Sequence, residues 1–298
     1  MKITILGNNS ALPAFGRYPT AQVINIQEEL FLMDCGEGAQ MRMQQFEVKS
    51  DRINHIFISH AHGDHYLGLV GLISSFSLKG RQRDLFVYCT KEIKKIIDIQ
   101  LPWDVGFKII YHFLEDGVSD ILYQTEKIEI HSFPVYHSVP THGFVFKEKF
   151  RARVLLPKKL QEYEIPKFFY KKLSEGFDYE KQNGSIIKND WVTYPGPASK
   201  VYAFAADTRY APEIIDFIRN ADLLYHETTY LEDLAEKAKL RFHSTTKQAA
   251  QIASDAHVKK MIIGHFSSKY KNLEVFLEEV KPIFENVELA MEGLTFEI

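Results

Sequence analysis

A run of metal-binding residue types directly after one strand-like segment constrains the fold of this chain more than any other feature. The segment INHIFIS, residues 53–59, leads into SHAHGDHYLGL, which supplies His60, His62, Asp64 and His65. Side chains two residues apart on an extended strand share a face, so His60 and His62 can hold one ion. The turn at Gly63 directs the other two side chains toward a second ion, and both imidazole and carboxylate are zinc ligands. A polar turn with incidental histidines does not explain four candidate ligands this close together.

Three other strand-like runs end in residues that would complete such a site: FPVYH at His137, VYAFAAD at Asp207 and MIIGH at His265. Open sheets collect their sites at the carboxyl ends of strands, so we expect these residues to meet the first four. Seven ligands suffice for two ions if Asp207 bridges them, and His142 competes with His137 for its place. For each single residue, the alternative is a cap or a satisfied polar group. No comparable setting surrounds His55, His112, His131 and His257.

A pair of metal ions would give this chain a hydrolytic site without a protein nucleophile. Two ions about 3.5–4 Å apart can hold a hydroxide between them at neutral pH and neutralise charge that grows on the scissile group. No serine or cysteine therefore receives a catalytic role. Cys35 and Cys89 are too few for a disulfide framework, and Cys35 is expected to be a small core residue.

The composition is typical of a folded chain, and its net charge does not indicate a polyanionic partner. Of the 298 residues, 45% are hydrophobic and 25% are charged, and the net charge is −3, so a nucleic-acid surface must be a local patch. The start, MKITILGNNSALPAFG, reads as a first strand rather than a signal peptide. No run approaches the roughly 18 apolar residues of a membrane span, and we expect a cytoplasmic protein.

The order of the expected elements predicts an α/β fold. Strand-like runs recur at 2–6, 21–26, 30–34, 53–59, 85–89, 107–113, 127–133, 143–147, 201–207, 222–227 and 259–265. Helix-length segments occupy 211–220, 229–241, 245–256 and 272–285. The early runs are spaced like hairpins by short polar turns, whereas the later ones alternate with helices. We therefore expect a β-rich first half and two sheets packed together with helices outside.

One stretch, residues 150–197, interrupts this pattern. It loses a clear core periodicity and is rich in charge, aromatic residues and turn residues. Residues 147–172 contain nine Lys or Arg against three Glu, a local charge of +6 in a chain of net charge −3. A long irregular insertion in a compact domain is usually functional or disordered. The alternative to a functional insertion is a solvated surface hairpin.

The metal-binding run and five further segments resemble a known family. HAHGDH resembles the signature of the metallo-β-lactamase fold superfamily, an αβ/βα sandwich of hydrolases. The segments ILGNNSALP, LMDCGEGAQ, HETTY, HSTTKQAA and GHFSSKY resemble ribonuclease Z, the tRNA 3′-endonuclease, in order and spacing from residue 3 to about 270. The resemblance implies one hydrolase domain over residues 1–298 with an inserted arm at about 150–197. It also implies removal of the 3′ trailer from tRNA precursors by metal-hydroxide attack on a phosphodiester, leaving a 3′-hydroxyl on the tRNA.

The resemblance further implies two zinc ions per subunit, with manganese as an alternative metal. One ion would lie on His60, His62, His137 and Asp207, and the other on Asp64, His65, Asp207 and His265. Asp64 matches the family's proton acceptor, which orients the attacking water. Glu227 of HETTY and His243 of HSTTKQAA match a pair implicated in proton transfer to the leaving 3′-oxygen. The plainer interpretation of this pair is helix capping, which Ser244 and Thr245 could also supply.

Residues around these ligands receive supporting roles. A phosphate would suit the hydroxyls of Ser267 and Ser268 and the charge of Lys269, which follow the last ligand. Gly36 and Gly38 in DCGEGAQ are expected to form a tight turn that leads into a helix. Asp34 is expected to support the site through one of its ligands.

The family's arm is a flexible protrusion that grips tRNA away from the active site, and the 150–197 insertion occupies its place. We expect phosphate contacts from Lys158, Lys159, Lys167, Lys171 and Lys172. Where the usual bacterial arm has a Gly-Pro-containing tip, this chain reads EIPKFFYKKLSEG, which affects the geometry of the tRNA grip and not the chemistry. The family commonly forms homodimers in which one subunit's arm presents tRNA to the other's site, and we expect a homodimer here.

Two other functions compete with tRNA processing. A small-molecule hydrolase of the same fold, such as a lactonase, thioesterase or cyclic-nucleotide phosphodiesterase, would share the metals but would need neither HSTTKQAA nor a basic arm. A nucleic-acid-binding protein with an inactive metal site would be favoured by loss of a ligand, and no ligand is missing.

Overall fold

The computed structural model describes residues 1–149, 152–196 and 198–298, which form two units. The larger unit comprises residues 1–124, 129–147 and 200–298, and the smaller comprises 125–128 and 148–199. Phe150, Arg151 and Pro197, which belong to the expected insertion, lie outside the described residues.

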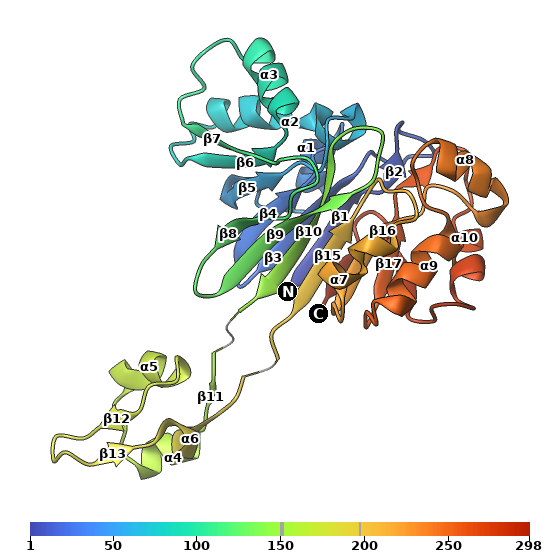
Figure 1. The fold of residues 1–298 in the computed structure, drawn as a ribbon. Helices are drawn as coiled ribbons and strands as arrows, with labels where there is room; N and C mark the ends of the chain where they lie inside the picture. The colour runs from blue at the N-terminus through green and yellow to red at the C-terminus, as the bar shows by residue number, and fades with distance from the viewer. Residues whose placement is uncertain (150–151, 197) are drawn as a thin grey trace. The chain divides into compact units, whose positions relative to one another are not determined.

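Two seven-stranded sheets build the larger unit (Figure 1). The first has the order β20-β1-β3-β4-β5-β6-β7, with β1 (Lys2–Gly7), β3 (Ala21–Ile26), β4 (Glu29–Met33), β5 (Ile53–Phe57), β6 (Leu85–Cys89), β7 (Ile109–Phe113) and β20 (Thr295–Glu297). The second has the order β19-β17-β16-β15-β10-β9-β8, with β8 (Ile121–Gln124), β9 (Ile128–Val135), β10 (Thr141–Glu148), β15 (Val201–Ala205), β16 (Leu223–Glu227), β17 (Met261–Gly264) and β19 (Val287–Leu289). A short parallel pair joins β2 (Asn9–Ser10) to β18 (Phe266–Ser267). Each predicted strand-like run overlaps a strand of the two sheets.

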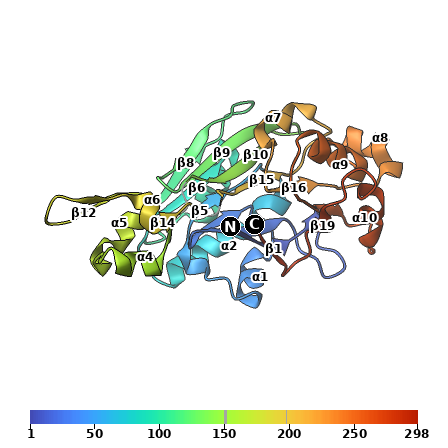
Figure 2. The same cartoon turned by 90° about the horizontal axis from the view of Figure 1, so that it is seen from below.

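Helices connect the strands and cover the sheets. They are α1 (Ala39–Gln45), α2 (Gly63–Leu78), α3 (Lys91–Gln100), α7 (Ile215–Ile218), α8 (Ala235–Leu240), α9 (Thr246–Asp255) and α10 (Glu274–Val280), with short 3-10 turns η1 (Ser50–Arg52), η3 (Pro212–Ile214) and η4 (Glu232–Leu234). Figures 1 and 2 show α1 and α2 beside the first sheet and α9 and α10 beside the second, which confirms the predicted sandwich. The described residues contain no helix long and apolar enough to cross a membrane.

The first half is less dominated by hairpins than its sequence suggests. The expected hairpin is found at β3 and β4, where Gln27 and Glu28 have φ of 49° and 70°, as a tight two-residue turn requires. From β4 to β7, however, the neighbours are parallel, with α1, α2 and α3 in the connections. Parallel neighbours need such crossovers because a strand must return to the same end of the sheet before the next begins.

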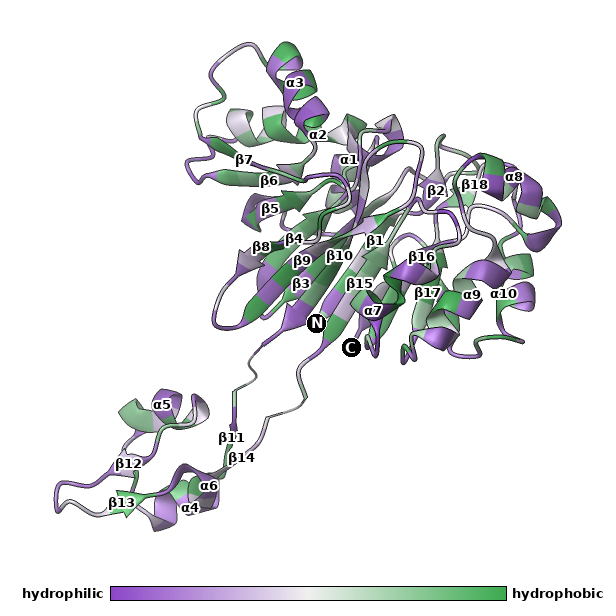
Figure 3. Cartoon of the chain, in the orientation of Figure 1, coloured by the Kyte–Doolittle hydropathy of each residue, from purple (hydrophilic) through white to green (hydrophobic). Residues whose placement is uncertain are grey.

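Aromatic rings fill the space between the two sheets. Phe31 of β4 lies 6.1 Å from Phe146 of β10, and Phe57 of β5 lies 5.6 Å from Phe144 of β10, measured between ring centroids. All four side chains are fully buried. Figure 3 shows how strongly hydrophobic the strands of both layers are. This packing fixes the two sheets against each other, and so fixes the ends of strands that carry the candidate ligands.

The smaller unit has a small core of its own. Its elements are β11 (Val154–Leu155), α4 (Pro157–Glu162), η2 (Lys167–Phe169), α5 (Tyr170–Ser174), β12 (Tyr179–Glu180), β13 (Ile186–Ile187), α6 (Asn189–Val192) and β14 (Thr193–Tyr194). The core consists of Leu160, Ile165, Leu173, Ile187 and Val192. β11 pairs with β14 and β12 with β13, so the stretch is an ordered module rather than an irregular loop.

Candidate metal centre and substrate cleft

Four residues from distant segments converge on one candidate metal position. The ligand atoms of His60, His62, His137 and Asp207 all lie within 4.8 Å of one another. His60 Nε2 and His137 Nε2 are 3.5 Å and 3.7 Å from Asp207 Oδ2. His62 Nδ1 lies 2.9 Å from His60 Nε2 and 3.2 Å from His137 Nε2. Three imidazoles and a carboxylate around one point are a tetrahedral zinc donor set.

A second cluster lies against the other oxygen of the same aspartate. His65 Nε2 and His265 Nε2 are 3.3 Å and 3.0 Å from Asp207 Oδ1. Asp64 Oδ2 is 3.6 Å from His65 Nε2 and 3.5 Å from His265 Nε2. The two carboxylate oxygens of Asp207 therefore face two different sets of ligands, as a bridging ligand must.

The chemistry of these side chains fits metal ions. Asp207 Oδ1 is buried and accepts no hydrogen bond within the described part of the chain, which is costly unless a cation pairs with it. Burial lowers the pKa of His60 well below its usual value, so its imidazole is neutral, the form that binds a metal. Burial also opposes the charge of Asp207, but His265, His65 and His60 outweigh it and hold the pKa of that carboxyl well below its usual range.

The ends of strands explain how the ligands are presented. After β5 the chain bends at residues 61–62, where His62 has extended backbone angles (φ −81°, ψ 143°), and enters α2 at Gly63, so the two ligand pairs diverge. Asp207 and His265 follow β15 and β17 with φ of 48° and 59°. This left-handed backbone costs roughly 1–2 kcal/mol per residue and turns each side chain toward the site. A β-carbon on Gly36 would lie 2.4 Å from the carbonyl oxygen of Asp64, so only glycine allows this approach.

Asp34 supports the second cluster through His65. His65 Nδ1 donates to Asp34 Oδ2 at 2.6 Å, which leaves Nε2 of the imidazole facing Asp207. Ser59 donates to Asp34 from its backbone nitrogen at 2.8 Å and from its hydroxyl at 3.0 Å. Hydrogen bonds of this kind fix the tautomer and orientation of a metal-binding histidine.

The substitution Asp34→Asn tests this support. Asparagine tolerates the positive φ of 54° at this position, so the backbone is retained while the charge is lost. We expect zinc affinity to fall about 10- to 100-fold, measured by competition with a chromogenic chelator. Asp98→Asn on the exposed face of α3 is the control and should bind zinc like the wild type. Unchanged affinity in Asp34→Asn would show that His65 needs no such partner.

Glu227 and His243 form a hydrogen-bonded pair beside the candidate metal ligands. His243 Nδ1 donates to Glu227 Oε1 at 2.8 Å. Glu227 also accepts from the backbone nitrogens of Thr208 and Thr229 at 2.9 Å and 3.0 Å and from the Thr229 hydroxyl at 2.6 Å. Burial disfavours a charge on His243, but Glu227 outweighs it and raises the pKa of His243 to about 9. The pair is not a set of helix caps, since α9 is capped by Thr245.

A cleft of about 670 Å³ opens onto the candidate metal ligands. Its lining includes Asp64, Asp207 and His243, and also the predicted phosphate contacts Ser267, Ser268 and Lys269. Sequence reasoning did not identify three further lining residues, Tyr230, Lys237 and Arg241. It also did not identify the carbonyl of Phe242, which accepts a hydrogen bond from His137 Nδ1 at 2.9 Å. Every residue has a backbone carbonyl, so the identity of residue 242 could not predict this hydrogen bond.

The remaining predicted residues lie elsewhere. His142 is buried and donates through Nε2 to the carbonyl of Glu115 at 2.9 Å, so His137 rather than His142 joins the cluster. Cys35 is fully buried in the core, as expected. The five candidate lysines Lys158, Lys159, Lys167, Lys171 and Lys172 belong to the smaller unit.

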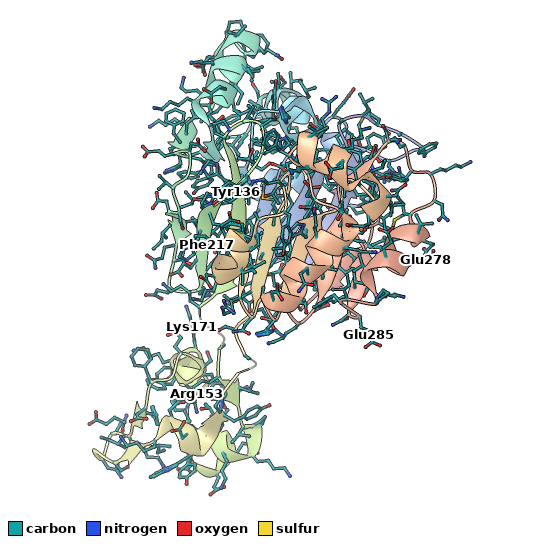
Figure 4. The ribbon with its side chains drawn as sticks, turned by 45° about the vertical axis from the view of Figure 1, so that its right-hand side comes forward. Tyr136, Arg153, Lys171, Phe217, Glu278 and Glu285 are labelled. Carbon is teal, nitrogen blue, oxygen red and sulfur yellow. The ribbon has the colours of Figure 1, made fainter. Side chains whose placement is uncertain are left out.

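In the part of the smaller unit that the structure describes, three cations form ion pairs within the unit, one of them Lys188 with Asp178 at 2.8 Å. Lys159 Nζ, one of the expected phosphate contacts, pairs with Glu162 at 2.8 Å, and Arg153 pairs with Asp190. Among the described residues, no carboxylate forms an ion pair with Lys158, Lys167, Lys171 or Lys172. Figure 4 labels Arg153 and Lys171 on this unit.

Solved structures share this fold over the whole chain. Human tRNase Z, short form, superposes with a TM-score of 0.71 at 24% identity, covering 100% of this chain and 99% of that one. The metallo-β-lactamase fold protein YhfI of Bacillus subtilis superposes with a TM-score of 0.70 at 17% identity, covering 99% of each chain. Two mixed sheets with flanking helices and clustered His and Asp side chains define the chain as a metallo-β-lactamase fold protein with a candidate metal site.

Relatives similar in sequence over the full length identify the family within this fold class. Ribonuclease Z of Phocaeicola vulgatus is 40% identical over 100% of this chain and 97% of its own length, and ribonuclease Z of Bacteroides fragilis is 37% identical over 98% and 97%. The chain belongs to the ribonuclease Z family. A family described as Anti-Pycsar protein Apyc1 also matches residues 1–101, a third of the chain that includes the HAHGDH run but not Asp207 or His265.

Proposed function

We propose that this chain is a zinc-dependent endoribonuclease that removes the 3′ trailer from tRNA precursors and leaves a 3′-hydroxyl on the tRNA. One observation carries the proposal: in a member of the ribonuclease Z family, Asp207 faces two ligand clusters beside a cleft that His243 also lines. We further propose that the protein acts in the cytoplasm as a homodimer.

The proposed metal site has two zinc ions, with manganese as an alternative. His60, His62, His137 and Asp207 would hold one ion, and Asp64, His65, Asp207 and His265 would hold the other. When bound, the two ions supply a nucleophilic hydroxide at neutral pH and neutralise charge on the scissile phosphate.

The protein's own groups orient the water and move the protons. Asp64 Oδ2 accepts from the backbone nitrogen of Ala11 at 2.7 Å, which fixes its carboxylate at the edge of the cleft. Burial opposes the charge of Asp64, but His65 and His265 keep its pKa below the usual value, so its carboxylate is ionised and can accept a hydrogen bond that orients the attacking water. His243, protonated through Glu227, donates a proton to the leaving 3′-oxygen.

The smaller unit is proposed to be the tRNA-binding arm. Lys158, Lys167, Lys171 and Lys172 are exposed and have no carboxylate partner among the described residues, so their charge is available to phosphates. Lys159, paired with Glu162, is expected to contribute least.

A small-molecule phosphodiesterase is the second candidate, because the candidate ligands and the cleft all lie in the larger unit. It would use the same ligands and cleft. It would not need the smaller unit, so the choice of substrate separates the two functions.

The proposed function is tested with a 3′-extended tRNA precursor and a metal chelator. We expect the untreated protein to release the trailer as one piece, dialysis against chelator to abolish cleavage, and zinc or manganese to restore it. A mature-length tRNA without a trailer is the control substrate and should remain intact. Full turnover in a metal-stripped sample, or no cleavage of the precursor by the zinc-loaded protein, would overturn the proposal.

A further inference from the structure

Two cations on one short helix line the cleft beside His243 and have no role in the chemistry described above. Lys237 lies in α8, and Arg241 directly follows the helix four residues later, so both side chains lie on the same face. Both residues line the cleft. In the described part of the chain, neither forms an ion pair with a carboxylate. Unpaired positive charge at the edge of a cleft attracts an anionic ligand.

The end of α8 is anchored to the metal centre, which distinguishes these cations from mobile surface charges. The carbonyl of Phe242 accepts from the metal ligand His137 at 2.9 Å, with Phe242 in a left-handed conformation (φ 55°). The backbone nitrogen of His243 donates to the carbonyl of Ala238 at 2.9 Å. The end of α8, with Lys237 in the helix and Arg241 directly after it, is therefore held at a fixed place relative to His243.

Tyr230 holds one of the two cations in position. Lys237 Nζ lies 5.2 Å from the centroid of the Tyr230 ring, within the range of a cation–π interaction. The Tyr230 ring in turn lies 6.1 Å from the ring of His243, edge to face. Tyr230 is buried, so it serves as a support for the ammonium group rather than as a surface for a nucleobase.

We infer that Lys237 and Arg241 form a subsite for the phosphate that joins the last two nucleotides of the tRNA, on the 5′ side of the cut. The inference rests on the proposed function, in which His243 donates a proton to the leaving 3′-oxygen. That oxygen must lie within hydrogen-bond reach of His243, so the nucleoside that carries it lies against the wall formed by α8. The backbone phosphate on the 5′ side of this nucleoside is the anion that the two cations meet.

The subsite is tested by removing charge from the protein and from the substrate in turn. The protein variant is Lys237→Gln/Arg241→Gln, and the substrate variant has a neutral methylphosphonate at the linkage 5′ of the last tRNA nucleotide. Each change alone is expected to lower kcat/KM for precursor cleavage about tenfold, because each removes a charge-assisted contact. Together they should cost little more than one change, since both remove the same contact.

The controls separate this subsite from the rest of the site. Lys239→Gln, on the same helix but outside the cleft, should cleave both substrates like the wild type. A methylphosphonate one linkage into the trailer should cost the same in the wild type and in Lys237→Gln/Arg241→Gln. Bound zinc equal to that of the wild type shows that the double variant is folded.

Two results would overturn the inference. If the costs of the two changes add fully, the cations contact some other group; if only the trailer linkage becomes insensitive in the variant, they bind the 3′ side of the cut. Both results leave the proposed function intact. If the wild type does not cut the precursor at all, the proposed function is overturned and this inference falls with it.

Discussion

Asp207→Ala is expected to lose both metal ions and to lower kcat/KM for a small chromogenic phosphodiester at least about a thousandfold, or about 4 kcal/mol of transition-state stabilisation. The two oxygens of Asp207 face different ligand clusters, so the substitution takes a ligand from both. His137→Ala takes a ligand from one cluster only and should cost less. Metal content after dialysis and steady-state rates measure the two effects.

His257→Asn is the matched control for Asp207→Ala. His257 is exposed and has φ of 53°, a conformation that asparagine tolerates, and it lies in none of the clusters. Both metals and the full rate should remain. If Asp207→Ala itself retained two metals and a near-normal rate, the ligand assignment would be wrong.

Replacing the lysines of the smaller unit that have no carboxylate partner among the described residues is expected to weaken tRNA binding without affecting hydrolysis itself. In the quadruple variant Lys158→Gln/Lys167→Gln/Lys171→Gln/Lys172→Gln, precursor tRNA cleavage should fall about 100-fold at low salt, mainly through a higher KM. The slope of log affinity against log salt should become shallower by up to about 0.9 for each phosphate that the variant no longer neutralises. Lys159→Gln alone should have a small effect, because Glu162 already neutralises Lys159.

The same quadruple variant should still hydrolyse the small phosphodiester, since all the proposed ligands lie in the larger unit. Lys91→Gln/Lys95→Gln, on the exposed face of α3, is the control for lysines neutralised outside the smaller unit and should cleave tRNA normally. Equal losses on both substrates would mean that the smaller unit supports the active site. Undiminished cleavage of tRNA would mean that the lysines are only a solvated face.

The ligand clusters could be predicted because the information for them is local. Six consecutive positions, 60–65, contain His60, His62, Asp64 and His65. Asp207 and His265 each follow a run that is plainly a buried strand. The carboxyl ends of strands meet at one edge of the sheets, so the polar residues at those ends include the candidate ligands.

Helix α2 shows why other elements were harder to predict. Its buried residues Leu69, Leu72, Ile73 and Phe76 have helical spacing, but Leu67 and Leu78 are exposed, which blurs the apolar stripe. The hairpin spacing expected for the first half was wrong from β4 to β7, since the crossover helices there were not recognised, whereas β8 and β9 do pair antiparallel.

Interactions that depend on tertiary structure left no local signal. Lys237 and Arg241 look like ordinary charges of a solvated helix, and only the anchoring of α8 beside His243 turns them toward the cleft. Phe242 contributes a carbonyl that any residue would supply. The internal ion pair of Lys159 likewise depends on the fold of the smaller unit.

The most direct test of the central claim is a single turnover on a 3′-extended tRNA precursor in ¹⁸O-labelled water, with both products analysed by mass spectrometry. If the clusters around Asp207 direct a water onto the scissile phosphate, one ¹⁸O atom will appear in the 5′-phosphate of the released trailer, and the tRNA will end in an unlabelled 3′-hydroxyl. A 2′,3′-cyclic phosphate on the tRNA, or label on the tRNA side of the cut, would contradict the account.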